Sequence, residues 1–321
     1  MLLRLLRGFP VILLILVGSL AAQWRKVEIG SLSWLQAIHF EDARNGWIGG
    51  SSGNLFRTTD GGTSWKSVEL SSSDLIRDIA FTDSSHGWIL MERDRFSRAR
   101  YGNASFILKT VDGGSTWSQE ELPLGTELRT RLFAVKGSGL FLLGEGGVML
   151  ALPDNGPIGR ANLPTKYLGL GAAFLNGRRI IVAGGGGSIF ASDDLGQTWR
   201  SVVSGGGEKD RKLNALFFFD ESFGWACGNE GVILKTKDGG RSWQQKESKV
   251  KGDLLDVRFF DRRLGFAVGD SGVILRSDDG GESWRPEGSP SKHRLERLAI
   301  AGDRVLAVGF GGTLLVRDSI R

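Results

Sequence analysis

The chain has 321 residues, enough for one large domain or two ordinary ones, with 48 glycines, 10 tryptophans and a formal net charge of +5. Its single cysteine, Cys227, excludes an intramolecular disulfide, so stability has to come from burial. Frequent glycine and tryptophan, with no long amphipathic helix after residue 25, predict many short strands joined by tight turns.

The first 21 residues have the layout of a secretory signal peptide. Arg4 and Arg7 precede an apolar run from Phe9 to Leu20, and small residues follow at Ala21 and Ala22. The run is shorter than the roughly 20 residues that a membrane-spanning helix needs. We expect cleavage near Ala21 and export to the periplasm or another extracytoplasmic space. The alternative is an uncleaved N-terminal anchor.

One octapeptide recurs along the chain and sets its organisation. The first copy reads Thr-Thr-Asp-Gly-Gly-Thr-Ser-Trp over residues 58–65. The aspartate and tryptophan of this box recur in five pairs: Asp60 and Trp65, Asp112 and Trp117, Asp194 and Trp199, Asp238 and Trp243, Asp279 and Trp284. These tryptophans lie 52, 82, 44 and 41 residues apart, so the interval of 82 hides a sixth copy, placed at residues 152–156 without its tryptophan. In most copies a glycine stands seven residues before the aspartate.

A seventh copy begins at Gly312, puts Ser319 at the aspartate position, and ends before its outer strand. The missing piece is at the other end of the chain, because residues 24–29 resemble residues 65–70, the strand after the first box. The sequence therefore predicts an all-β, seven-bladed β-propeller over residues 22–321, closed by an N-terminal outer strand. We expect such a closed ring to be a monomer.

The chemistry of the box fits the turn of a hairpin. The aspartate can accept hydrogen bonds from turn amides, the glycine pair permits positive φ, and the tryptophan can cover the turn and fill the gap between blades. A residue that repeats in every blade is expected to be structural, so the box aspartates are poor candidates for catalysis.

These motifs resemble the BNR/Asp-box repeat. Residues 224–243 (Gly-Trp-Ala-Cys-Gly-Asn-Glu-Gly-Val-Ile-Leu-Lys-Thr-Lys-Asp-Gly-Gly-Arg-Ser-Trp) resemble one branch most closely, the photosystem II stability/assembly factor family. The resemblance covers almost all of residues 24–319. It implies an exported seven-bladed propeller, periplasmic or on the thylakoid-lumen side, that holds a membrane-protein assembly intermediate. It implies no cofactor and no enzymatic activity.

Asp boxes also occur in sialidases and endo-glucanases, so a glycan-binding or glycoside-hydrolysing propeller is the alternative. A sialidase needs a tyrosine nucleophile, but Tyr101 falls in an expected mobile loop and Tyr167 between blades. A hydrolase with two carboxylates stays open on the sequence. Four acidic residues fall near the predicted starts of inner strands, and we expect them to be solvated turn carboxylates: Asp74, Asp78, Glu127 and Asp256.

The sequence does not carry the spacing typical of a metal site or a phosphate-binding loop. His39, His86 and His293 fall in different blades without ligand spacing, so we expect no metal site. Cys227 aligns with valines in sister copies and is interpreted as a small buried apolar residue. Residues 184–187, four glycines, lack the lysine and helix of a phosphate loop and are predicted to form a turn.

The repeat is interrupted most clearly at residues 92–105, an insertion in the second copy. It carries Arg93, Arg95, Arg98 and Arg100 beside Phe96 and Tyr101. Further basic residues fall near the segments between blades: Arg77, Arg129, Arg131, Lys212 and Arg294. By analogy with other propellers, these segments share one face. We predict a basic platform for an acidic protein segment or, through peripheral contact, an anionic membrane surface; the alternative is a solvated loop. Because we expect the chain to be exported, we expect no nucleic-acid partner.

Overall fold

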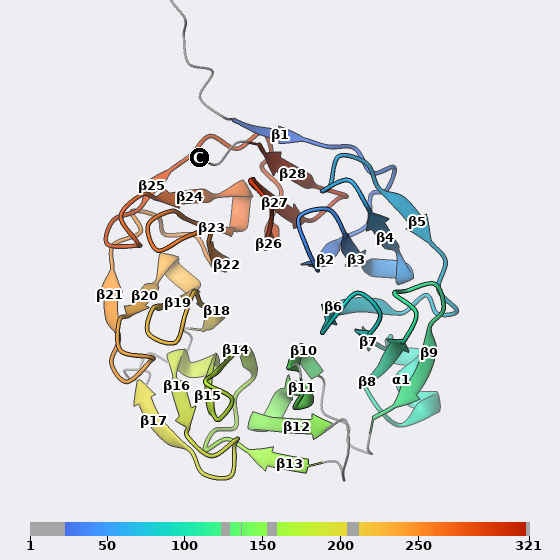
Figure 1. The fold of residues 1–321 in the computed structure, drawn as a ribbon, viewed down its shortest axis with the longest axis horizontal. Helices are drawn as coiled ribbons and strands as arrows, with labels where there is room; N and C mark the ends of the chain where they lie inside the picture. The colour runs from blue at the N-terminus through green and yellow to red at the C-terminus, as the bar shows by residue number, and fades with distance from the viewer. Residues whose placement is uncertain (1–22, 123–128, 136, 153–158, 204–211, 319–321) are drawn as a thin grey trace, which may run out of the picture.

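The computed structural model describes residues 23–122, 129–135, 137–152, 159–203 and 212–318. These residues form seven four-stranded antiparallel sheets arranged as blades around a central axis, so the predicted seven-bladed β-propeller is confirmed (Figure 1). The expected sixth box and Ser319 lie outside the described residues, as does the expected signal peptide.

Each blade runs from an inner to an outer strand. Blade 1 is β2 (Leu35–Phe40), β3 (Gly46–Gly50), β4 (Leu55–Thr58) and β5 (Lys66–Val68). Blade 2 is β6 (Leu75–Phe81), β7 (Gly87–Glu92), β8 (Ser105–Thr110) and β9 (Ser118–Glu121). Blade 3 is β10 (Arg129–Val135), β11 (Gly139–Gly144), β12 (Val148–Leu152) and β13 (Gly159–Asn162). Blade 4 is β14 (Gly169–Leu175), β15 (Arg179–Gly184), β16 (Ile189–Ser192) and β17 (Arg200–Val203).

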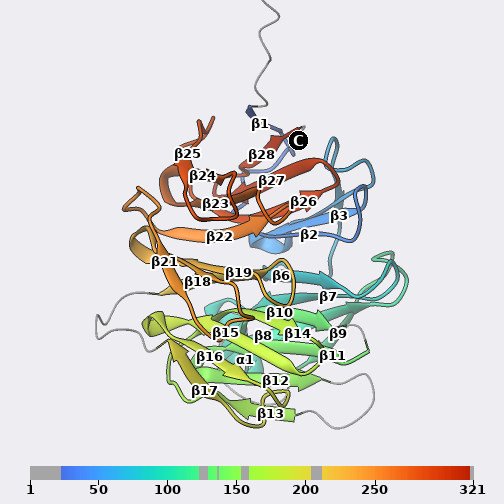
Figure 2. The same cartoon turned by 60° about the vertical axis from the view of Figure 1, so that its left-hand side comes forward.

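The remaining blades follow the same plan. Blade 5 is β18 (Leu213–Phe218), β19 (Gly224–Gly228), β20 (Ile233–Thr236) and β21 (Gln244–Lys246). Blade 6 is β22 (Leu254–Phe259), β23 (Gly265–Gly269), β24 (Ile274–Ser277) and β25 (Arg285–Pro286). Blade 7 is β26 (Leu295–Ala301), β27 (Arg304–Gly309), β28 (Leu314–Arg317) and β1 (Trp24–Lys26). In this last sheet β1 pairs antiparallel with β28 in the outer position, and Figure 2 shows the two strands side by side.

Antiparallel order gives the propeller two distinct faces. Turns between strands two and three and links between blades emerge together, as hydrogen bonds such as Asn229 N to Lys212 O (2.9 Å) show. We call this side the link face. It carries five short 3₁₀ turns and the helix α1: η1 (Ser51–Gly53), η2 (Glu145–Gly147), η3 (Gly185–Gly187), η4 (Asn229–Gly231), η5 (Asp270–Gly272) and α1 (Arg95–Tyr101). The boxes and the turns between strands one and two emerge on the other side, the Asp-box face. Within the described part of the chain, no helix has the length and hydropathy of a membrane span.

The glycine that precedes most boxes by seven residues ends a link-face turn. Gly231 has φ +71°, and a Cβ there would lie 2.1 Å from the carbonyl oxygen of Val250 in the link to the next blade. Gly272 is in the same position, with a Cβ 1.9 Å from Ser291 O. Only glycine combines this φ with so close an approach, which explains the spacing seen in the sequence.

The inner strands share a second feature that positions the central channel. All seven have a register shift at the same place, near the start of the strand, as between Ile76 and Asp78 or Leu254 and Asp256. Their inner edges have no neighbouring strand, so side chains satisfy the exposed backbone groups. Asn214 Nδ2, for example, donates to Leu254 O of the next blade at 2.8 Å. These bonds join neighbouring blades around the axis.

Candidate binding site

The Asp boxes are structural turns, as predicted. Asp60 Oδ1 accepts hydrogen bonds from the amides of Thr63 and Ser64, both at 3.0 Å, and Oδ2 accepts from Ser64 Oγ at 2.6 Å. Thr58 Oγ1 donates to the same carboxylate and accepts from Gly62 N. The Ser64 hydroxyl and amide are the main causes that lower the pKa of Asp60 to about 2. The same pattern recurs at Asp112, Asp194, Asp238 and Asp279.

The box tryptophans pack against the preceding blade. Trp117 of blade 2 meets Trp47 of blade 1 edge to face, with ring centroids 5.9 Å apart. The fully buried Trp284 lies 5.7 Å from Phe259, which is itself stacked on Trp225 of blade 5 at 3.6 Å. Trp65, Trp199 and Trp243 are partly buried in comparable places. The five described boxes therefore hold the ring together from its periphery, and turn hydrogen bonds occupy the carboxylates of their aspartates at Asp60, Asp112, Asp194, Asp238 and Asp279.

The insertion in blade 2 is a short helix, and the expectation of a mobile loop around Tyr101 was wrong. Asp94 caps α1 by accepting a hydrogen bond from Ser97 N at 2.7 Å, and Gly102 ends the helix in the left-handed region with φ +76°. An N-cap aspartate and a C-terminal glycine are the usual signals of a helix. They stand in the sequence but are separated by only seven residues, so the expectation of a loop overlooked them.

Arg93 is the arginine of this insertion that the structure buries. Only 2 % of its side chain is exposed, Nη2 donates to Glu121 Oε1 at 2.7 Å, and Nη1 donates to Asn103 Oδ1. Its guanidinium carbon also lies 4.6 Å from the ring centroid of Tyr101 and 4.3 Å from that of Phe106. Arg93 therefore anchors α1 to blade 2 and offers nothing to a partner in this conformation.

The other side chains of α1 divide into paired and free groups. Arg98 Nη2 donates to Glu92, and its Nε donates to Arg93 O at 2.9 Å. Phe96 is 84 % exposed and Tyr101 52 % exposed. Arg95 is exposed and makes no ion pair with any residue that the structure describes, and Arg100 is exposed beside the Tyr101 ring. We call Arg95, Phe96, Arg100 and Tyr101 the α1 surface.

The five other predicted basic residues do not form one patch with it. Arg77 is on an inner strand, bonded to Glu92 and to Gln36 Oε1, while Arg129 is buried. Arg131 lines the central channel. Lys212 and Arg294 are on the link face, and Arg294 pairs with Asp270 at 3.0 Å and Glu296 at 2.8 Å.

Acidic residues also lie on the link face. The turns between strands two and three bring Glu145, Glu230 and Asp270 there, beside the basic residues of the links. The prediction of a basic platform rested on the links and the insertion and left out these turns. The charge of the face is therefore mixed. On the α1 surface, two exposed arginines without an ion pair among the described residues stand next to exposed aromatic rings.

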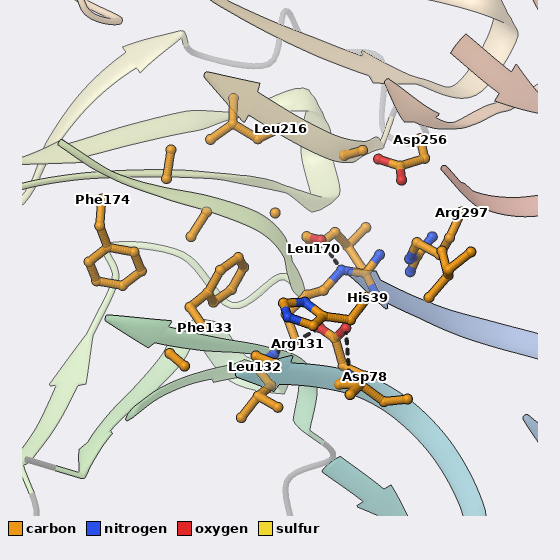
Figure 3. Close-up of a pocket in the computed structure, with 18 of the residues that line it drawn as sticks. His39, Asp78, Arg131, Leu132, Phe133, Leu170, Phe174, Leu216, Asp256 and Arg297 are labelled. Atoms are coloured by element: carbon orange, nitrogen blue, oxygen red, sulfur yellow. Dashed lines mark hydrogen bonds between the residues drawn. The ribbon is translucent and has the colours of Figure 1, made fainter. Parts of the chain in front are cut away.

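The central channel contains charged residues that the sequence did not single out. It encloses a cavity of about 490 Å³ that is lined by residues of all seven inner strands (Figure 3). The strands of blades 6, 7, 1 and 2 supply Asp256, Arg258, Arg297, His39 and Asp78, and Arg131 comes from blade 3. A wall of Phe133, Phe174, Leu216 and small residues lies across from them.

The two channel aspartates are not the solvated turn residues that we expected. Asp78 Oδ2 accepts from Leu132 N of blade 3 at 3.1 Å, and Asp256 Oδ2 accepts from Leu298 N of blade 7 at 2.9 Å. Their other oxygens accept from the amides of Ile79 and Val257. Burial raises the pKa of both carboxyls, and the nearby arginines counteract it. The expectation failed because the register shift turns these side chains inward, and that shift has no signature in the sequence.

The remaining candidates are easily placed. Burial, with Arg258 nearby, lowers the pKa of His39 to about 4, so its imidazole is neutral at ordinary pH. Cys227 is fully buried, as predicted, and burial raises the pKa of its thiol well above the usual value. Tyr167 is half-exposed on the link face. Across the described ranges, no cluster of three or more histidine, cysteine, aspartate or glutamate side chains could hold a metal ion.

A family model and several solved structures match this chain. The family model for the photosynthesis system II assembly factor YCF48 matches residues 18–77, 63–170, 160–237, 207–285 and 236–318. No curated protein sequence matches the chain. A solved structure of YCF48 bound to D1 peptide is 20 % identical, with a TM-score of 0.72 over 92 % of this chain and 96 % of that one. YCF48 from Cyanidioschyzon merolae is also 20 % identical, with a TM-score of 0.75 over 92 % and 99 %.

The propeller fold itself is shared more widely. A GH74 xyloglucanase from Xanthomonas campestris is 17 % identical, with a TM-score of 0.70 over 93 % of this chain and 54 % of the enzyme. At this identity the likeness shows the fold alone and carries no glycan-cleaving activity to this chain.

Proposed function

The chain belongs to the family of the photosystem II assembly factor YCF48, and from this premise we propose that it is an exported, non-enzymatic assembly or stability factor. Its partner is a segment of a membrane-protein subunit in an assembly intermediate. The observation that carries the proposal is the family match over residues 18–318. The solved YCF48 that holds a D1 peptide supports a peptide segment as the kind of partner. The apolar run of residues 9–20 supports export.

The link face is the side on which we propose that the partner binds. Nine large hydrophobic side chains are exposed in the described part of the chain, and six of them are on this face: Leu32, Trp34, Phe96, Tyr101, Tyr167 and Phe310. Exposed aromatic residues supply much of the binding energy of protein interfaces because they bury a large area with few rotatable bonds.

Within this face, the α1 surface has the chemistry for an acidic segment. Arg95 and Arg100 present guanidinium groups that pair bidentately with carboxylates, and Phe96 and Tyr101 stand beside them. This contact is narrower than a basic platform over the whole face, because Arg93 is buried and acidic turns neutralise much of the remainder.

The test is affinity capture from native membranes, followed by mass spectrometry and by direct binding of peptides from the captured subunit. We expect a membrane-protein subunit in the capture. Replacing Arg95, Arg100 and Tyr101 together with alanine should weaken peptide binding by at least about tenfold. A matched control replaces Arg44 and Arg262, which are exposed on the Asp-box face. Equal binding by the two folded variants would remove the α1 surface from the proposal.

Activity on glycans tests the alternative of a glycoside-hydrolysing propeller. Both channel carboxylates already accept hydrogen bonds from backbone amides through each oxygen, so we expect no hydrolysis of sialosides or β-glucans. Turnover that disappears on Asp78→Asn or Asp256→Asn would overturn the non-enzymatic role.

A further inference from the structure

The central channel is amphipathic, and no part of the proposed function uses it. One side is formed by Phe133, Phe174 and Leu216 of blades 3, 4 and 5. The other side carries charged and polar groups from blades 6, 7, 1 and 2, as Figure 3 shows for Asp256, Arg297, His39 and Asp78. A cavity of about 490 Å³ with an apolar wall and a few convergent polar groups is typical of sites for small ligands.

The charges in this cavity do not balance. Three arginines, Arg131, Arg258 and Arg297, line it with only two aspartates, and His39 is neutral. Arg131 and Arg297 have hydrogen-bond acceptors in the inner strands, since Arg131 Nε donates to Leu170 O at 2.9 Å and Arg297 Nη1 donates to Glu296 O at 2.5 Å. One positive charge in the channel is therefore left for an anion to neutralise.

Arg258 is the channel arginine whose guanidinium N–H groups are available to an anion. Its Nη2 lies 3.6 Å from Asp256 Oδ2, and the Asp256 carboxylate already accepts two amide hydrogen bonds. The Arg258 guanidinium donates no hydrogen bond of normal length to any described residue. About a third of its side chain, 32 %, is exposed. Its guanidinium carbon lies over the Phe217 ring, 5.3 Å from the centroid, which is a cation–π contact.

A path to this group exists on the Asp-box face. A second cavity, of about 560 Å³, shares Phe133, Phe174 and Arg258 with the channel and extends to Phe219 and Asp220. The latter two residues are in the turn between strands one and two of blade 5. Arg258 lines both cavities, so a ligand that enters from the Asp-box face, opposite to the link face, can reach it.

We propose that the channel binds a small amphipathic anion, a monocarboxylate with an apolar chain or ring. Its carboxylate pairs with the guanidinium of Arg258 beside His39, and its apolar part lies against Phe133, Phe174 and Leu216. A carboxylate matches the planar fork of arginine, and the apolar wall favours an organic anion over an inorganic one. This site does not depend on the proposed function, because it is in the channel and not on the α1 surface.

The test is titration calorimetry of the purified full chain with 4-phenylbutyrate. We expect saturable binding at one site, and at least about tenfold weaker binding of the uncharged 4-phenylbutanamide. Arg258→Gln should weaken carboxylate binding by a similar factor, and Arg258→Lys should be intermediate because it keeps the charge and loses the fork. Arg44→Gln is the matched control, since Arg44 is exposed on the Asp-box face of blade 1 and lines neither cavity.

The outcomes separate the possibilities. Equal binding of the acid and the amide, or unchanged binding in a folded Arg258→Gln variant, would overturn the site. Inorganic phosphate that displaces 4-phenylbutyrate with equal affinity would overturn the apolar part of the proposal. No detectable binding up to about 10 mM would overturn the site as a whole. Loss of peptide binding at the link face would leave all of these results unaffected.

Discussion

Arg93 is the residue for which the sequence and the structure make opposite predictions. As a member of an exposed arginine cluster, it would affect partner binding and leave stability unchanged. As the buried anchor of α1, it has the reverse effect. Removing charge-assisted hydrogen bonds costs about 1.5–3 kcal/mol, and each cation–π contact about 0.5–1 kcal/mol. Because Glu121 is half-exposed and regains water, we expect Arg93→Ala to lower the free energy of unfolding by about 3 kcal/mol.

The assay is urea unfolding followed by far-UV circular dichroism. The dependence of the free energy of unfolding on urea concentration should be the same in all variants, which shows that they unfold in the same transition. Arg95→Ala is the matched control and should change stability by less than about 0.5 kcal/mol. Arg93→Met keeps the aliphatic packing and should lie between the two. A loss of less than about 1 kcal/mol in Arg93→Ala, with partner binding reduced, would refute the buried anchor. It also follows that replacing all four insertion arginines together would confuse loss of binding with loss of folding.

Three other predictions address the ring. Trp225→Ala should cost about 3–5 kcal/mol. Trp225→Phe should cost about 1–2 kcal/mol, because it keeps an aromatic ring, as Phe266 does in the sister blade, but loses ring volume and the bond from Trp225 Nε1 to Gly280 O. Urea midpoints of the two variants test this. Hydrogen bonds within the boxes lower the pKa of Asp60, Asp112 and Asp194 from 3.8 to about 2. Because the folded state holds these carboxylates ionised, they stabilise the fold above pH 3.8, and this stabilisation is lost as the pH falls towards 2. Asp112→Asn should therefore reduce the dependence of the unfolding midpoint on pH in this window, and an unchanged slope would contradict it. Cys227 should resist thiol reagents in the native state and react only on unfolding, and Cys227→Val should cost less than about 1.5 kcal/mol in the same urea assay.

The repeating part of the molecule could be predicted from the sequence. The box aspartates and tryptophans recur at nearly constant spacing, and each box is a local turn whose hydrogen bonds join residues no more than four apart. Cys227 could be placed in the core because sister copies carry valine there. These predictions needed only local chemistry and comparison of the repeats with one another.

The candidate sites could be predicted only in part. The insertion was found because it interrupts the repeat, but burial separated Arg93 from Arg95, two residues away in the same segment. Asp78 and Asp256 were noticed as carboxylates near inner strands, and their place in the channel depends on a register shift that brings them to the next blade. Arg258 was missed altogether, because nothing around it in the sequence distinguishes it from the surface arginines.

The sequence by itself determined that the chain forms a ring of seven similar blades, because short-range turn chemistry is written into each copy of the repeat. Only the tertiary structure decided which charged side chains face solvent, which anchor α1 and which meet in the channel. The physical reason is distance along the chain. Arg131 influences the ionisation of both Asp78 and Asp256 across different blades, and residues so far apart meet only when the ring closes.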